Sequence, residues 1–284
     1  MITFWAIVYD RSLVDGEWGR IYGNGIRSWQ QLTPAPEVII FGQECHRAEC
    51  DVLGIRYIEA PCDADGLPLV NKCLALVEQY ASHAVKCYLC PDLILDQDFV
   101  SAANYCNHWL RGWLAIGRRY TVAIPEVVDY ANGGLAAAQR VAKEQGEMEH
   151  GGVVSYLMYT HYIWQDMPDF RCNHGVYDNY MVWYALAVGL PVIDITGLAI
   201  VVHQEHPEHF DFDKDGTNKV NYELKPKEMF FAGAQSASFI THCKMLYPTF
   251  TINDDYAWIG QFDHFMQIQD ENGNRGHGLM ITQR

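Results

Sequence analysis

Hydrophobic and polar positions change period repeatedly along the first half of the chain. Short apolar runs bounded by Gly, Pro or Asp predict strands, and apolar residues that recur every three or four positions predict helices. Strands are predicted over residues 2–9, 38–41, 55–58 and 86–90, and helices over about 24–32, 69–82 and 97–109. Because strands alternate with helices, we expect an α/β fold with a mostly parallel central sheet flanked by helices.

The second half contains one helix for which the sequence has capping signals at both ends. Residues 178–188 have helical periodicity, with Asp178 at the N-cap position, Gly189 at the C-cap position and Pro191 just beyond. This combination predicts where the helix begins and ends.

Further segments complete the pattern. Residues 134–148 are Ala-rich and charged, which predicts a surface helix, and residues 192–202 predict a single buried strand. Residues 211–228 are polar and predict a loop, whereas residues 226–246 predict another helix. Since no internal repeat or low-complexity linker interrupts the chain, we expect a single domain over residues 1–284.

Composition indicates a globular protein with a substantial core. Hydrophobic residues make up 49% of the 284 positions and charged residues only 19%, a balance that excludes a disordered chain. Asp and Glu number 35 against 20 Lys and Arg, which gives a formal charge of −15. A strongly negative surface repels nucleic-acid backbones, although a small basic pocket for a nucleotide is compatible with it.

The sequence predicts neither a signal peptide nor a transmembrane segment. The N-terminal apolar run has no basic region before it and is cut short by Asp10. The longest apolar stretch, residues 184–202, contains Gly189, Pro191 and Asp194, which argues against a membrane span. Nine Cys residues without a secretory signal favour reduced thiols, so we expect a cytoplasmic protein.

Two motifs suggest metal chemistry but lack a required feature. Cys87 and Cys90 form a C-x-x-C pair inside a predicted strand, where positions three apart point to opposite faces. Residues 211–216 read D-x-D-x-D-G, the start of a calcium loop, but the twelfth position is Tyr222 rather than Glu. We therefore expect neither a cysteine metal or redox pair nor an EF-hand.

Polar residues follow three predicted strands at their carboxyl ends, where open α/β sheets bind ligands. Tyr9 and Asp10 follow the first strand, Gln43 follows the second, and Asp92 follows the strand that ends at residue 90. Asp92 suits a hard cation that bridges to a diphosphate, and it equally suits an ordinary turn. Both interpretations of Asp92 stay open from the residues alone.

Three histidines, His203, His206 and His209, lie directly after a predicted buried strand in the run HQEHPEH. Imidazoles bind Mn or Zn and also contact phosphate. Because Pro207 breaks any helix, the three cannot share one helical face, and we expect one of them to be functional. A solvated polar loop is the competing interpretation.

Asp178 has two compatible interpretations. As an N-cap residue it accepts backbone N–H bonds, and the same surroundings keep its carboxylate ionised. A general base that removes the proton of a hydroxyl must also be ionised, so capping and catalysis do not conflict.

Taken together, segments over about 250 residues resemble bacterial and phage glycosyltransferase family 2-like proteins, which have a GT-A nucleotide-diphospho-sugar transferase fold. The matching segments occur in the family's order. They are N-G-I-R-S-W (24–29), IIFG (39–42), G-L-P-L-V-N (66–71), YLCPDLIL (88–95), WLAIGRR (113–119), MPDF (167–170), YDN (177–179), GLPVID (189–194), VHQEH (202–206) and TINDDYAW (251–258).

The resemblance implies a metal-assisted glycosyltransferase that moves a sugar from a nucleotide-diphosphate sugar to a hydroxyl acceptor, with Mn or Mg as the cation. Asp92 and His203 take the positions of metal ligands, and Asp178 takes that of the catalytic base in inverting members. The implied nucleotide-sugar-binding residues are Tyr9, Asp10, Gln43, Asn71, Asp92, His174 and Asn179.

The resemblance also divides the single domain. It implies a nucleotide-binding half over about 1–110, an acceptor and catalytic half over about 111–260, and a C-terminal tail over 261–284. The acceptor stays open between a saccharide, a lipid-linked sugar, a protein and, least favoured by the acidic charge, a modified nucleobase.

The chain departs from the family pattern in two places. Asn173, His174 and Tyr177 stand where relatives often have Gly, Arg and Trp, and Cys90 opens the D-x-D-like element. Because Cys is no hard oxygen ligand, the metal would depend on Asp92 and water. Two other functions therefore stay open: a metal-dependent hydrolase that uses His203 and His206, and a non-catalytic GT-A-like sugar-nucleotide-binding module.

Overall fold

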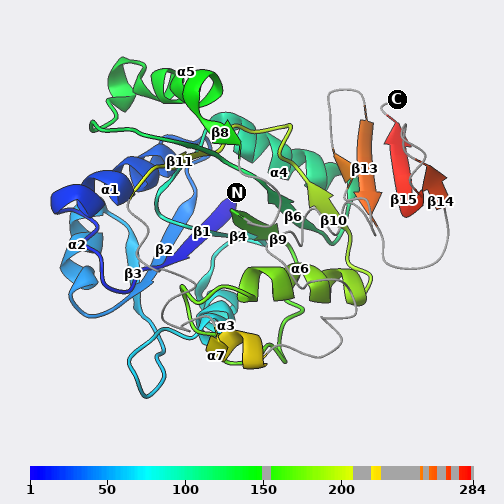
Figure 1. The fold of residues 1–284 in the computed structure, drawn as a ribbon, viewed down its shortest axis with the longest axis horizontal. Coiled ribbons are helices and arrows are strands. Elements are labelled where there is room, and N and C mark those ends of the chain that lie inside the picture. Colours follow the sequence, from blue (N-terminus) through cyan, green and yellow to red (C-terminus); the bar gives the residue numbers. More distant parts are fainter. Residues whose placement is uncertain are drawn as a thin grey trace.

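A mainly parallel sheet forms the centre of the computed structural model (Figure 1). The structure describes residues 1–148, 155–206 and 219–224, together with four short strands near the C-terminus. The central seven strands have the order β3-β2-β1-β4-β9-β6-β10, in which only β9 runs antiparallel to its neighbours. Their bounds are β1 Ile2–Ile7, β2 Glu37–Gly42, β3 Arg56–Glu59, β4 Val85–Leu89, β6 Leu114–Gly117, β9 Tyr156–Tyr159 and β10 Val192–Asp194.

Four C-terminal strands extend this sheet beyond β10. β12 (Phe250–Thr251) and β13 (Tyr256–Gly260) both pair with β10, while β15 (Arg275–Thr282) pairs with β13, and β14 (Gln267–Gln269) pairs with β15. Segments of the predicted C-terminal tail therefore belong to the sheet.

Helices cover both faces of the sheet, as Figure 1 shows. Their bounds are α1 Gly16–Gln30, α2 His46–Leu53, α3 Val70–Tyr80, α4 Gln97–Trp109, α5 Gly134–Gln145, α6 Tyr177–Ala187 and α7 Lys219–Leu224, with a 3-10 turn at Tyr130–Asn132. This arrangement confirms the predicted α/β class.

Alternation along β1 divides the interior into two cores. Phe4 points to the face covered by α1 and α4, where its ring makes edge contacts with Trp29 at 5.8 Å and Phe99 at 5.9 Å. Trp5 points to the opposite face, covered by α3 and α6, and packs against Tyr88 at 4.8 Å. Successive strand residues point to opposite sides of a sheet, so a continuous apolar strand fills two cores.

A second, smaller sheet packs at the carboxyl edge of the main one. It contains β5 (Leu93–Ile94), β11 (Val202–Gln204), β7 (Tyr120–Val122) and β8 (Glu147–Met148), in that order. In the antiparallel pair β5·β11, His203 lies opposite Leu93, and β11 runs parallel to β7. This register places His203 next to the chain that has just left β4.

The structure corrects three predictions in the second half of the chain. The predicted strand 192–202 is two strands, β10 and β11, which belong to different sheets. α6 begins at Tyr177, so Asp178 lies in its first turn rather than at the N-cap position. The predicted loop 211–228 contains α7.

Two helices of the first half were also mispredicted. α1 begins at Gly16 rather than near residue 24, because its glycines interrupt the apolar pattern. α2 was not predicted, since it has only eight residues.

Some predictions lie outside the described residues. These are the D-x-D-x-D-G motif (211–216), His209, the predicted helix 226–246 and residues 252–255 of the TINDDYAW segment.

Candidate functional site

Three side chains converge where β4 ends. The Oδ2 atom of Asp92 lies 3.3 Å from Nε2 of His206 and 3.4 Å from Nε2 of His203. The two Nε2 atoms are 3.2 Å apart. Within the described residues, this Asp92–His203–His206 cluster is the one group of three or more such side chains able to hold a metal ion.

The position of Asp92 depends on close packing against α1. A Cβ atom added to Gly25 would lie 2.0 Å from the carbonyl oxygen of Pro91, so only glycine allows this approach. The indole of Trp29 donates to the carbonyl of Leu93 at 2.8 Å on the other side of Asp92. The turn between β4 and β5 is thereby held against the helix, and Asp92 with it.

The cluster fits a divalent cation. Thr121 Oγ1 lies 3.2 Å from Nδ1 of His203 and can accept a hydrogen bond from the Nδ1–H, and in that tautomer the Nε2 lone pair faces Asp92 and His206. The second carboxylate oxygen, Asp92 Oδ1, is buried and has no hydrogen-bond partner among the described residues. Three converging ligand atoms and a buried carboxylate oxygen without a hydrogen-bond partner suit a cation. The two imidazoles favour Mn, Fe or Zn over Mg.

The cluster also keeps Asp92 ionised without a cation. Burial by itself raises the pKa of Asp92, but the charge of His203 and hydrogen bonds from His203 and His206 lower that pKa well below its ordinary value. The charge of Arg119 acts in the same direction. A carboxylate with these partners stays available as a ligand over the whole physiological pH range.

Aromatic and basic side chains cover the cluster from the side of α1. The ring of Trp18 lies 4.7 Å from that of His206, and the guanidinium of Arg11 lies 4.2 Å from the centre of the Trp18 ring. Arg11 also pairs with Asp10 at 3.0 Å. The cluster is therefore bordered on this side by an aromatic ring and by the Arg11–Asp10 ion pair.

Asp178 lies on the neighbouring side of the same strand end. The hydroxyl of Tyr177, at the start of α6, contacts the hydroxyl of Tyr88 on β4 at 2.9 Å. Burial raises the pKa of the Cys90 thiol most, Asp92 raises it further, and Asp178 adds a smaller increase. The contact between Tyr177 and Tyr88 brings the start of α6, and Asp178 with it, to the end of β4.

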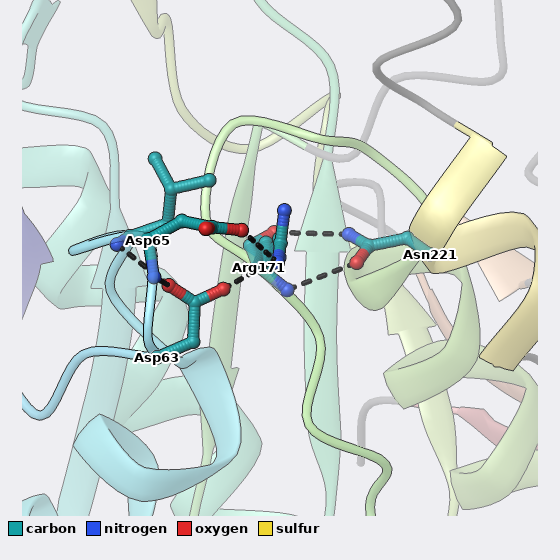
Figure 2. A network of polar contacts seen from close by, with 5 residues as sticks. Asp63, Asp65, Arg171 and Asn221 are labelled. Carbon is teal, nitrogen blue, oxygen red and sulfur yellow. Dashed lines mark hydrogen bonds and ion pairs between the residues drawn. The ribbon is translucent and has the colours of Figure 1, made fainter.

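The segment before α6, residues 170–176, is here called the α6 loop. Figure 2 shows Arg171 between two acidic residues on one side and Asn221 of α7 on the other. Asn221 is fully buried; its Nδ2 donates to the carbonyls of Arg171 and Gly175, and its Oδ1 accepts from the Arg171 N–H, each at 2.9 Å. The Arg171 guanidinium pairs with Asp63 at 2.6 Å and with Asp65 at 2.7 Å.

The α6 loop has unusual backbone conformations. Asn173, Gly175 and Val176 have φ angles of 63°, 65° and 72°. A left-handed conformation is costly for a β-branched residue such as Val176, and such strain concentrates at functional sites. The surrounding contacts hold this loop, together with the buried His174, directly before Asp178.

The other predicted binding residues lie in two further places. Tyr9 is partly buried and Asp10 exposed in the loop after β1, and Gln43 is exposed after β2. His46 joins these loops, because its Nδ1 accepts from the Gln43 N–H and its Nε2 lies on the Arg11 carbonyl, both at 3.0 Å.

Asn71 and Asn179 have amide groups used inside the protein. Asn71 Nδ2 donates to Asp169 at 2.7 Å and to the Met167 carbonyl at 3.1 Å. Asn179 Nδ2 donates to Asp178 at 3.2 Å. The amide oxygens of both residues are buried and lack a partner in the part of the chain that the structure describes, so they remain available to a ligand.

The sequence analysis expected one functional histidine in the HQEHPEH run, and only the alternative hydrolase used His203 and His206 together. The structure brings both side chains to Asp92. The sequence analysis did not identify Arg171 and Asn221 as partners, because the residues they contact are about 50 to 100 positions away in the sequence and leave no local signal.

Comparisons with known proteins bear on the fold. No family model matches the chain, and no curated protein matches it in sequence. Among solved structures, the chain is similar to residues 1–349 of S. aureus TarS in complex with UDP-GlcNAc, at 9% identity, over 85% of this chain and 72% of that chain, with a TM-score of 0.50.

Two other solved structures are more distant. Glucosyl-3-phosphoglycerate synthase from Mycobacterium tuberculosis, in complex with Mn2+, UDP and glucosyl-3-phosphoglycerate, matches at 15% identity over 72% of each chain, with a TM-score of 0.42. A CMP:2-keto-3-deoxy-manno-octonic acid synthetase complexed with CTP matches at 10% identity over 78% of this chain and 99% of that chain, also at 0.42. These neighbours are nucleotide-sugar transferases and a nucleotidyltransferase.

The similarity to TarS shows that this chain has a GT-A-like fold, which confirms the predicted fold class. Among the described helices, none combines the length and apolar character needed to cross a bilayer.

Proposed function

We propose that the protein is a metal-assisted glycosyltransferase that moves a sugar from a nucleotide-diphosphate sugar to a hydroxyl acceptor. The observation that carries this proposal is the Asp92–His203–His206 cluster at the carboxyl end of β4, in a GT-A-like sheet. Ligands of open α/β sheets bind at this edge. The low identity to the solved structures means that the site, rather than the fold, supports the activity.

The cluster supplies a cation site beside a source of positive charge. A divalent cation held by Asp92, His203 and His206 would neutralise the charge that develops on a leaving diphosphate. Arg119, whose charge already acts on Asp92, adds to that field. An acidic protein with a formal charge of −15 needs such local positive charge to hold an anionic donor.

Asp178 is the proposed general base. It lies in the first turn of α6, where the helix dipole favours a negative side chain, and Asn179 donates a hydrogen bond to its carboxylate. Asp178 takes the proton of the acceptor hydroxyl as that oxygen bonds to the anomeric carbon and the bond from this carbon to the diphosphate breaks. The acceptor stays open between a saccharide, a lipid-linked sugar, a protein and a modified nucleobase.

The remaining predicted residues surround the proposed donor site. Tyr9, Asp10 and Gln43 lie in loops at the carboxyl ends of β1 and β2, and we assign them to the nucleotide side. Asn71, in the first turn of α3, is assigned to the nucleotide side as well, whereas His174 and Asn179, in and after the α6 loop, are assigned to the sugar side. The nucleotide-binding half is then about 1–110, and the acceptor and catalytic half follows it.

A thermal-shift panel tests the proposal. The protein is screened against UDP-, GDP-, CMP- and dTDP-sugars with MnCl2, with ZnCl2 and with EDTA. A ligand that binds only the native state at 100 times its Kd adds about 2.7 kcal/mol to stability. We expect at least one donor to stabilise the parent only with metal, and Asp92→Asn to lose that effect. Asp51→Asn, at an exposed position on α2, is the matched control.

A metal-dependent hydrolase is the second candidate, and the chemistry of the three metal-ligating side chains specifically supports it. Two imidazoles and one carboxylate also form catalytic zinc sites that activate water. Elemental analysis of purified protein separates the candidates: stoichiometric zinc with no donor-dependent stabilisation supports the hydrolase. A non-catalytic module would bind donors, yet transfer or hydrolysis of the bound donor would be absent in both the parent and Asp178→Asn.

A further inference from the structure

Two buried amides connect the segments that carry the cluster. Gln204 follows His203 directly on β11 and is fully buried. Its Nε2 donates to the backbone carbonyl of Asp92 at 3.0 Å and to that of Ile21 at 2.7 Å. Its Oε1 accepts from Asn24 Nδ2 at 2.9 Å. The Gln204 side chain therefore joins Asp92 to β11, the strand that carries His203.

Asn24 anchors this link within α1. It is also fully buried, which is unusual for Asn inside a helix. Besides Gln204, its Nδ2 donates to the carbonyl of Glu126 at 3.0 Å, and its Oδ1 accepts from the Val128 N–H at 2.9 Å. Every polar atom of both amide groups has a partner, so the pair forms a complete buried network.

We propose that Gln204 and Asn24 are positioning residues that fix the distance between Asp92 and the imidazoles of His203 and His206, and so set the affinity and geometry of the metal site. This inference rests on the cluster being the metal site of the proposed function. The hydrogen bond from Gln204 fixes the peptide group of Asp92, whose side chain is part of the cluster. Groups that orient metal ligands contribute 10–100-fold to metal affinity.

A different role is available to buried amides, namely stability alone. The two roles predict different results, because a stabilising contact changes the free energy of unfolding without changing the metal Kd of the folded protein. Gln204→Glu is the sharpest variant, since a carboxylate keeps the size of the side chain but cannot donate to the two carbonyls. Gln204→Met keeps the length without any polar atom and serves if the Glu variant does not fold.

Ser28→Ala is the matched control. Ser28 is buried on the same helix, donates to the Gly25 carbonyl at 2.6 Å and accepts from the Leu95 N–H at 3.0 Å. It links α1 to the segment after β5 without contacting Asp92 or β11. Its loss therefore tests the stability of this region without disturbing the link between the metal ligands.

The experiment measures metal binding to the full chain by calorimetry with MnCl2 and ZnCl2, together with the visible absorption of bound Co2+ and urea unfolding in EDTA. We expect the Gln204 variants to raise the metal Kd by about 10–100-fold and to change the Co2+ spectrum, while Ser28→Ala changes neither. Metal Kd values and Co2+ spectra equal to those of the parent, with Asp92→Ala still abolishing binding, would overturn this inference alone. A parent that binds none of these metals would overturn the proposed function as well.

Discussion

The two sides of the candidate site are held by different chemistry. On the cluster side, the fully buried amides of Asn24 and Gln204 join α1, β11 and the turn after β4. On the α6 side, Arg171 joins the α6 loop to Asp63 and Asp65 through ion pairs that water reaches, and the buried amide of Asn221 binds the loop backbone. Neutral buried bonds are insensitive to salt, whereas partly exposed ion pairs are screened by it. We therefore expect a rigid metal side and an α6 side whose stability depends on solution conditions.

Removal of one imidazole should have the largest effect and should be confined to the cluster side. His206→Gln takes away a ligand atom that lies 3.3 Å from Asp92 Oδ2. We expect the Kd for Mn2+ or Zn2+ to rise more than the roughly 10–100-fold typical of an outer partner. Calorimetric titration checks this, with His108→Gln on the exposed face of α4 as control. Unchanged affinity would leave Asp92 and His203 as the only ligands of the cluster.

Asn221→Ala should destabilise the α6 side, with a smaller effect than the removal of the His206 imidazole. The variant leaves the carbonyls of Arg171 and Gly175 without their donor, and a buried unsatisfied group costs about 1–3 kcal/mol. We expect a loss of that order in the free energy of unfolding, measured in urea, and no change in the metal Kd. Asn132→Ala, which removes an exposed amide, is the control. A weakened metal site would show that the two sides are coupled.

Arg171→Met should reveal the ionic character of the α6 side. It removes both ion pairs and keeps most of the apolar stem, so we expect a loss of about 1 kcal/mol at low salt. That loss should shrink in 1 M NaCl, where the Debye length is about 3 Å. The measurement is urea unfolding of parent and variant at two salt concentrations. If the difference in unfolding free energy between parent and variant did not depend on salt, the ion pairs of Arg171 would not be what stabilises the α6 side.

Asp169→Asn should give the smallest effect, and one that depends on pH. The hydrogen bond from Asn71 lowers the pKa of Asp169, burial opposes this, and Lys72 lowers it further. A lowered folded-state pKa contributes stability above the unfolded value of about 3.9, which is lost as pH falls through the folded value. Because the side chain is more than half exposed, we expect less than about 1 kcal/mol at pH 6. Unfolding curves at pH 6 and pH 3 should show the difference between parent and variant shrink at the lower pH.

The sequence predicts β1, β2, β3 and β4 of the central sheet, because these strands are short apolar runs separated by helical patterns, but it predicts no strand at β6 or β9. It fails where tertiary contacts decide. The glycines of α1 weaken the helical pattern, yet Gly25 is required where the Pro91 carbonyl approaches. The apolar run 192–202 gives no sign that its two ends join different sheets.

The residues of the candidate site also differ in how far the local sequence indicates them. Asp92 and His203 could be predicted from their places after strands and from the family resemblance. His206 entered only through the alternative hydrolase, because its position beside Asp92 depends on how the chain turns after β11. Gln204 carries no signal of its own, because a buried amide and a surface amide look alike in a sequence. The proposed metal ligands Asp92 and His203 can thus be recognised from local sequence, whereas the buried contacts that support them cannot.

Anomalous scattering from crystals grown with MnCl2 or ZnCl2 locates a bound metal ion directly. We expect one strong peak within about 2.0–2.3 Å of a carboxylate oxygen of Asp92 and of Nε2 of both His203 and His206. The same peak should be absent from crystals of Asp92→Asn. A metal bound elsewhere, or an unoccupied cluster at saturating metal, would contradict the account.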